Sequence, residues 1–151
     1  MNITQSLQGV TRLFLDTAPV IYAVERQPQY LPFVRVIFEH IFSGLAMGIA
    51  SPVTLAECLV RPYSLGQLKL QQEFIELLTN SKNIEFVSIN NPPIAIQAAQ
   101  IRARHNIQLP DAFQIAVALA ADCDAFLTND ITFRRVTELQ VLILNDFSAA
   151  E

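Results

Sequence analysis

The sequence predicts a three-layer α/β/α fold with a mainly parallel sheet of five strands, and two observations predict it. Short apolar runs of strand length alternate along the chain with longer segments of helical periodicity. The chain has 151 residues, which suits one domain, and contains no internal repeat, linker or low-complexity tract. We therefore expect a single domain over residues 11–147, with an N-terminal extension at 1–10 and a tail at 148–151.

The chain is expected to start with a strand followed by helices. Residues 11–15 predict a short buried strand, and Pro19 then fits the first turn of a helix. Pro28 and Pro32 interrupt the pattern. Residues 33–42 carry apolar side chains at helical spacing and predict a helix with a wide apolar face. This face is either core or a site for a helix of a partner protein.

The next segment predicts a strand and two helices. The second strand is expected at residues 46–50. Ser51 and Pro52 then have the types typical of an N-cap and a first helical turn, and this helix is expected to reach Val60. Residues 65–79 have apolar positions at helical spacing and predict a further helix.

The second half of the chain continues the alternation of strands and helices. A third strand is expected at residues 84–89, and helices are expected at 91–104 and 109–121. The fourth and fifth strands are expected at 125–128 and 141–144. Strands separated by helices in this way are typical of a parallel sheet with helices on both faces.

Four acidic residues stand at or near the ends of these apolar runs. Asp16 follows the first strand and Asp130 follows the fourth, while Glu57 lies on the helix after the second strand and Asp111 opens a helix. Ligands of parallel sheets bind beyond the carboxyl ends of the strands, so all four acids could face one pocket. Converging carboxylates repel each other, and a bound divalent cation is the usual remedy. The pattern predicts a Mg²⁺ or Mn²⁺ site.

Each acid also has a purely structural interpretation. Asp16 and Asp111 could cap helices, Glu57 could lie on a solvated helix face, and Asp130 could be a turn residue.

The composition limits the classes of partner. Hydrophobic residues make up 52% of the chain and charged residues 16%, which leaves apolar surface for a homodimer or a protein partner. The net charge of −4 argues against broad attraction of nucleic acid, but four carboxylates that hold metal would leave the remainder near neutral. No apolar run approaches the roughly 18 residues of a membrane span, and no signal-peptide pattern begins the chain. We expect a cytoplasmic protein.

Several other kinds of site are excluded. The four glycines form neither a GxGxxG nor a GxxxxGK[ST] motif, and the two histidines lie outside any catalytic or zinc-binding motif. Cys58 and Cys123 are interpreted as small core residues in a reducing compartment. The Asp-x-Asp motif of haloacid-dehalogenase phosphatases would need an acid at position 18, where Ala18 stands.

The segments around the four acids resemble the PIN-domain ribonucleases, and more narrowly the VapC-type toxins of bacterial toxin–antitoxin pairs. The segments that carry the resemblance are Leu13–Thr17, Ser51–Glu57, Leu109–Ala116 and Cys123–Asp130. Each motif is weak alone, but four in this order are specific, and together they extend over almost all of residues 11–147. The resemblance implies a Mg²⁺- or Mn²⁺-dependent endoribonuclease that cleaves RNA, forms a homodimer and is inhibited by a cognate antitoxin.

Two features depart from the family pattern. The family usually has Asn two residues after the first acid, where this chain has Ala18, and the start at residues 1–10 is longer than usual. Neither departure removes an acid.

The resemblance also assigns roles to individual residues. Asp16, Asp111 and Asp130 are expected to bind the metal directly, and Glu57 directly or through water. Thr17 and Thr128 are expected to support these ligands. The arginines near the motifs either hold RNA phosphates or are ordinary surface residues; they are Arg61, Arg102, Arg104, Arg134 and Arg135.

Two alternatives from other classes remain at this point. One is a PIN-like module that binds a protein partner and has no activity. The other is a metal-dependent phosphatase on a similar sheet, against which Ala18 counts.

Overall fold

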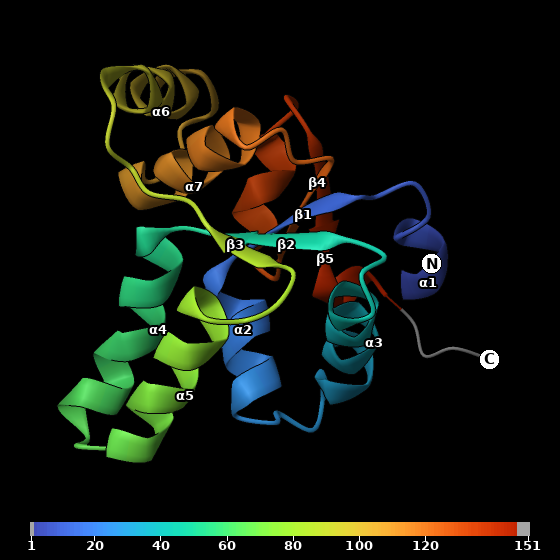
Figure 1. Ribbon diagram of the computed structural model, residues 1–151. Coiled ribbons are helices and arrows are strands. Elements are labelled where there is room, and N and C mark those ends of the chain that lie inside the picture. Colours follow the sequence, from blue (N-terminus) through green and yellow to red (C-terminus); the bar gives the residue numbers. More distant parts are fainter. Residues whose placement is uncertain (1, 148–151) are drawn as a thin grey trace.

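The computed structural model describes residues 2–147 and contains one sheet of five parallel strands in the order β3-β2-β1-β4-β5 (Figure 1). The strands are β1 (Arg12–Leu15), β2 (Met47–Ala50), β3 (Ile84–Phe86), β4 (Ala125–Thr128) and β5 (Gln140–Ile143). The expected fold class is confirmed. Met1 and the expected tail at 148–151 lie outside the described residues.

Helices cover both faces of the sheet (Figure 1). One face carries α1 (Ile3–Ser6), α2 (Thr17–Val24), α3 (Leu31–Phe42), α4 (Pro52–Ser64) and α5 (Leu68–Thr79). The other carries α6 (Pro92–His105), α7 (Leu109–Ala120) and the 3₁₀ helix η1 (Ile131–Arg135), and a short 3₁₀ turn, η2 (Leu144–Asp146), follows β5. Successive side chains of β1 alternate between the two layers: Leu13 and Leu15 pack on the first and Phe14 on the second.

Three expected boundaries shift by three or four residues: β3 ends at Phe86 and not at residue 89, and the other two lie at the corner between α4 and α5. The helix expected to end at Val60 continues through Pro62 to Ser64. The Pro62 carbonyl accepts hydrogen bonds from the Gln67 backbone and from the Gln71 side chain, which satisfies this turn. The chain then reverses at Gly66, whose φ of +66° lies in the left-handed region that glycine adopts at little cost. The next helix therefore starts later than expected.

The N-terminal extension packs on the domain. Asn2 caps α1 by accepting a hydrogen bond from the Thr4 N–H at 2.8 Å. Ile3, Leu7 and Val10 are buried in the same cluster as the core residues of α3. From residue 3 onward, the extension therefore contributes side chains to the core.

The two cysteines do not form a disulfide. Both are free, with Cys58 buried and Cys123 half-buried. Within residues 2–147, no helix combines the length and the apolar character needed to cross a bilayer.

Three phenylalanines pack between the sheet and the layer of α7 and η1. Phe126 stacks on Phe14 with ring centroids 5.0 Å apart and an interplanar angle of 3°, and it meets Phe133 at 4.7 Å. All three side chains are fully buried. Phe14 and Phe126 come from β1 and β4, just below the carboxyl ends of these strands, so this cluster supports the segments that bear Asp16 and Asp130.

Phe126→Ala is expected to destabilise the protein by about 3–5 kcal/mol, because it opens a cavity among fully buried rings. Chemical denaturation gives the free energy of unfolding. Phe42→Ala, at a side chain that is 46% exposed, is the matched control and should cost much less. Equal losses for the two variants would contradict the assigned role of the aromatic cluster.

Candidate active site

The strand order creates a switch point beside β1. The chain passes from β1 to β2 and β3 on one side, and then crosses to β4 on the other side of β1. In open parallel sheets, ligands bind in the crevice at such a point, beyond the carboxyl ends of the strands. Asp16 follows β1 directly, and its N–H donates to the Leu127 carbonyl of β4 at 3.0 Å. Thr128 ends β4, with Asp130 two residues later.

Asp16 is a buried carboxylate at the centre of this edge, only 7% exposed. Thr128 Oγ1 donates to its Oδ2 at 2.8 Å, and Gln114 Nε2 lies 3.5 Å from its Oδ1. Asp16 occupies the N-cap position of α2, but its side chain makes no capping hydrogen bond. The helix-cap interpretation therefore does not account for this side chain, which points toward β4 and α7 instead.

A buried polar network lies beside Asp16. Gln114 Nε2 donates to Thr54 Oγ1 at 2.8 Å, Thr54 Oγ1 donates to the Leu15 carbonyl at 3.1 Å, and Ser51 Oγ donates to Gln114 Oε1. Gln114, Ser51 and Thr54 are fully buried. Because each polar group has a partner, the network fixes the Gln114 amide near Asp16. Sequence reasoning gave Gln114 no role, although a glutamine three residues after Asp111 in an apolar helix was a usable signal.

Glu57 is held at the same edge by Thr17. The Thr17 hydroxyl, in the first turn of α2, donates to Glu57 Oε1 at 2.7 Å. Ser51 and Thr54 form a capping box that fixes the start of α4, and Glu57 lies one turn further along. Glu57 is exposed, as the solvated-face interpretation expects, but its carboxylate is hydrogen-bonded toward the site.

Asp111 and Asp130 lie on the other side of the crevice. Asp111 is half-buried in the first turn of α7. Asp130 caps η1, because its Oδ1 accepts from the Thr132 N–H at 2.9 Å and from the Thr132 hydroxyl at 2.8 Å. Asp130 is therefore a turn residue, as its structural interpretation expects. Only one of its two carboxylate oxygens is used in this way, which leaves Oδ2 for a ligand.

The charges of the four acids act on one another. Burial raises the pKa of Asp16 to about 6, and the negative charge of Glu57 adds to this rise. Hydrogen bonds, chiefly the one from Thr128, act in the opposite direction and lower the pKa. Burial also raises the pKa of Asp111 to about 6, with further contributions from the charges of Asp16, Asp130 and Glu57. Within residues 2–147, none of the four forms an ion pair with a basic side chain.

The donor chemistry fits a hard divalent cation. Carboxylate oxygens are the ligands that Mg²⁺ and Mn²⁺ prefer, and here they carry charge that no basic side chain balances. In the described part of the chain, the side chains do not bring three or more Asp, Glu, His or Cys residues together closely enough to hold an ion as they stand. The four acids share one electrostatic environment, and their side chains would have to move to complete a metal site.

The five candidate arginines differ in their surroundings. Arg135 lines a cavity of about 450 Å³ together with Asp111 and Asp130. The other four lie elsewhere: Arg134 pairs with Asp146 at 2.7 Å, Arg104 pairs with Glu138 at 2.6 Å, Arg102 donates to the Ile107 carbonyl, and Arg61 is exposed in the last turn of α4. The structure therefore brings one of them, Arg135, to the cavity that borders the acids.

Comparison with protein families agrees with this architecture. A family model described as the PIN domain matches residues 13–139. The chain belongs to the PIN-domain family. The match spans all four acids and the strands β1 to β4 except the first residue of β1, and it ends just before β5. No curated protein sequence is a significant match to the chain.

Solved structures share the fold of this PIN domain. VapBC2 from Rickettsia felis, bound to a DNA fragment from its promoter, matches with a TM-score of 0.70 and 17% identity over 88% of this chain and 98% of its own. VapBC-1 from nontypeable Haemophilus influenzae matches with a TM-score of 0.64 and 22% identity, over 89% and 99% of the two chains. VapC20 from Mycobacterium tuberculosis, a toxin that cleaves the sarcin-ricin loop, matches with a TM-score of 0.62 and 14% identity, over 76% and 86%. These similarities confirm the expected fold.

Without metal, the free energy of unfolding is expected to rise as the pH falls from about 7.5 to about 5. The folded pKa of Asp16, about 6, lies above the ordinary value of 3.8, so the folded state retains a proton that the unfolded chain has lost in this window. At about 1.4 kcal/mol per pH unit, Asp16 alone contributes on the order of 1–1.5 kcal/mol over this window, because the difference in bound protons develops mainly between about pH 6 and pH 5. Urea denaturation in EDTA at several pH values measures the effect.

Asp111→Asn tests the same electrostatics. Removing one charge relieves repulsion among the acids, so the variant should be more stable than the parent near pH 7 and show a weaker pH dependence. The scan stops at about pH 5 because the pKa of Glu138 is lowered from its ordinary 4.5, and its contribution is lost only in more acidic solution. A parent protein whose stability is flat or falls between pH 7.5 and 5 would contradict the raised pKa values.

Proposed function

We propose that this PIN-domain protein is a Mg²⁺- or Mn²⁺-dependent endoribonuclease and the toxin of a toxin–antitoxin pair. The observation that carries the proposal is the set of four carboxylates at the switch point of the sheet, none of them balanced by a basic side chain in the described chain. The similarity of fold to VapC toxins, one of which cleaves the sarcin-ricin loop, supports the choice of substrate.

Each acid has a role in this proposal. Asp16, Asp111 and Asp130 would bind the ion, and Glu57 would bind it directly or through water. The ion would supply positive charge at the scissile phosphate and make a water molecule more acidic. Thr128 and Gln114 orient Asp16, and Thr17 orients Glu57. The reaction adds water across a P–O bond of RNA, and a positioned carboxylate is available to take the proton of the attacking water.

The alternative classes predict different results. An inactive PIN-like binding module would not cleave RNA with any metal. A phosphatase would turn over a small phosphate ester, but the residue two positions after Asp16 is Ala18, which cannot act as a general acid.

The purified chain is expected to cleave RNA with Mg²⁺ or Mn²⁺ and to lose this activity in excess EDTA. Asp111→Asn should reduce cleavage by at least about a hundredfold, because it removes a charged ligand. Mg²⁺ should also raise the melting temperature of the parent at pH 7.5 and raise that of Asp111→Asn much less. Gel assays and thermal scans measure the two effects.

The matched control for this variant is Asp122→Asn. Asp122 is exposed, and its φ of +56° lies in the left-handed region, which asparagine tolerates. It should retain full activity. Cleavage by the parent that persists undiminished in EDTA would refute the metal-dependent mechanism, and full activity of Asp111→Asn would remove Asp111 from the site.

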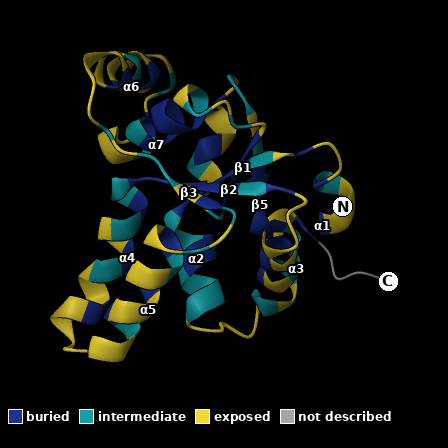
Figure 2. Ribbon diagram, in the orientation of Figure 1, coloured by how far each residue is buried: buried dark blue, intermediate teal, exposed yellow. Residues whose placement is uncertain are grey.

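We also propose a homodimer that binds a cognate antitoxin and acts in the cytoplasm. The corner where α4 ends and α5 begins is largely exposed (Figure 2). Its large apolar residues are Val60, Tyr63, Leu65 and Leu68, with exposed fractions of 64%, 59%, 57% and 70%. A mainly apolar groove of about 360 Å³ also runs between α2, α3 and α5. Apolar surface of this kind marks protein contacts.

Light scattering at high micromolar concentration is expected to give twice the mass of one chain, or a complex with a co-purifying protein. The physical reason is the free energy gained when the exposed apolar side chains leave water. A monomer at this concentration, with no partner after gentle purification, would contradict the proposal.

A further inference from the structure

We infer that the cavity between the α6–α7 corner and η1 is a subsite for the RNA nucleotide next to the scissile phosphate. In this subsite Arg135 holds a phosphate, and the amides of Asn106 and Gln108 contact the base. The inference rests on the proposed nuclease function and extends it to the residues that select the substrate. It also separates Arg135 from Arg134, its neighbour in the sequence.

The cavity has the size and position of a nucleotide site. Its volume of about 450 Å³ lies within the range of roughly 300–1,000 Å³ that is common for small-molecule sites. Asp111 and Asp130 form one part of its lining, so the cavity opens directly beside the proposed site of hydrolysis. A nucleotide bound here would place its flanking phosphate next to these two acids.

Arg135 supplies positive charge in this cavity and is the basic residue among those that line it. Its Nη1 donates to the Asn106 carbonyl at 2.9 Å, and no ion pair joins it to Asp111 or Asp130 in the described part of the chain. The single bond to Asn106 fixes the direction of the side chain and leaves other N–H groups of the guanidinium for a phosphate. Arg134 instead pairs with Asp146 at 2.7 Å and does not line the cavity.

Asn106 and Gln108, which carry amide side chains, line the same cavity. Both residues are exposed, and neither side chain makes a hydrogen bond within residues 2–147. An amide offers a donor and an acceptor together, which suits the edge of an unpaired base. Asn106 has φ +54°, which ends α6 and starts the turn that bears the second amide.

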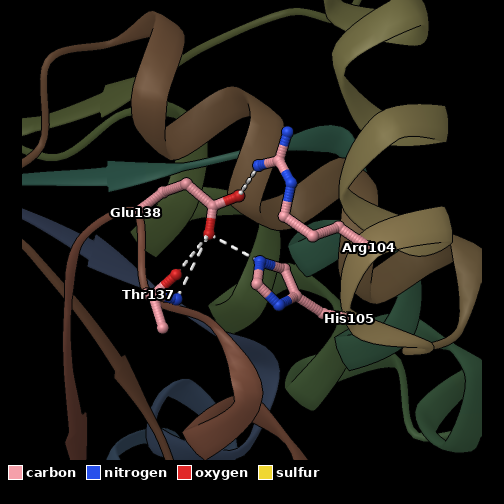
Figure 3. A network of polar contacts seen from close by, with 4 residues as sticks. All are labelled: Arg104, His105, Thr137 and Glu138. Atoms are coloured by element: carbon pink, nitrogen blue, oxygen red, sulfur yellow. Dashed lines mark hydrogen bonds and ion pairs between the residues drawn. The ribbon is translucent and has the colours of Figure 1, made fainter.

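A network centred on Glu138 ties the end of α6 to the segment after η1 (Figure 3). This residue follows η1, and its carboxylate accepts from Arg104 Nη1 at 2.6 Å and contacts His105 Nε2 at 2.6 Å, both in the last turn of α6. Thr137 contributes two further hydrogen bonds to the same carboxylate. The corner of α6 is thereby anchored to the segment that bears Arg135, so the cavity exists before RNA binds and little ordering is needed. Arg104 is engaged in this network, which leaves the phosphate contact to Arg135.

The test compares Arg135→Gln with Arg134→Gln, two neighbours that lose the same charge. The probe is a short labelled single-stranded RNA of randomised sequence, and the full chain carries Asp111→Asn so that the RNA stays intact. Arg135→Gln should weaken binding about tenfold and lower the slope of log Kd against log salt by about one unit. Arg134→Gln should change neither quantity. Arg135→Lys should keep the salt slope, because it keeps the charge.

A second comparison addresses the base. Asn106→Gly removes the amide and retains the left-handed backbone, and Gln108→Ala removes the other amide. In the otherwise unaltered chain, with Mn²⁺ and the randomised RNA, each variant should lose the base preference at one position beside the cleaved bond. Sequencing of the cleaved ends measures this preference. If the two amides had a purely structural role, their removal would not change the preference.

The outcomes separate the subsite from the proposed function. If the parent cleaves RNA with metal, but Arg135→Gln binds like Arg134→Gln and both amide variants keep the parent preference, the subsite is overturned and the nuclease function stands. If the parent neither binds nor cleaves RNA, both fall. The subsite is established if only Arg135→Gln weakens RNA binding and lowers the slope of log Kd against log salt, and if the amide variants change the base preference.

Discussion

The buried carboxylate of Asp16 is the group on which the rest of this edge depends. A charge that is only 7% exposed is costly unless hydrogen bonds and a counter-charge stabilise it. The fold supplies the hydrogen bonds from two directions, through Thr128 at the end of β4 and through Gln114 on α7. It supplies no basic side chain from the described residues. The remaining requirement for positive charge is what makes a cation the natural complement of this edge.

The same shortage of positive charge explains why the site is strained without a ligand. The pKa values of Asp16 and Asp111 are both raised to about 6, and part of this rise comes from the other acids. Near neutral pH the acids would be ionised at a cost to stability, and a bound ion would recover that cost. The buried hydrogen bonds of Gln114, Ser51 and Thr54 provide a rigid support that holds the acids near one another in spite of their repulsion.

The acids and the nearby arginines differ in whether their charge is balanced. None of the four acids forms an ion pair in the described part of the chain, while most of the nearby arginines are engaged in contacts that brace helices and turns. Arg135 differs because it lines the cavity beside Asp111 and Asp130. In a protein with a net charge of −4, attraction of RNA would have to come from a few such local contacts and from the ion, since the overall field is repulsive.

The sequence by itself determined the fold class, the approximate place of each strand and the positions of the four acids relative to the strands and helices. Short apolar runs and helical periodicity depend on local chemistry, which the chain displays directly, and the fourth strand matched residue by residue. Only the tertiary structure decided which side chains meet. Gln114 lies about 60 residues from Ser51 and Thr54 in the sequence, so no local pattern could show that these side chains join beside Asp16. The different surroundings of Arg134 and Arg135 likewise arise from η1, whose turn directs adjacent side chains toward different partners.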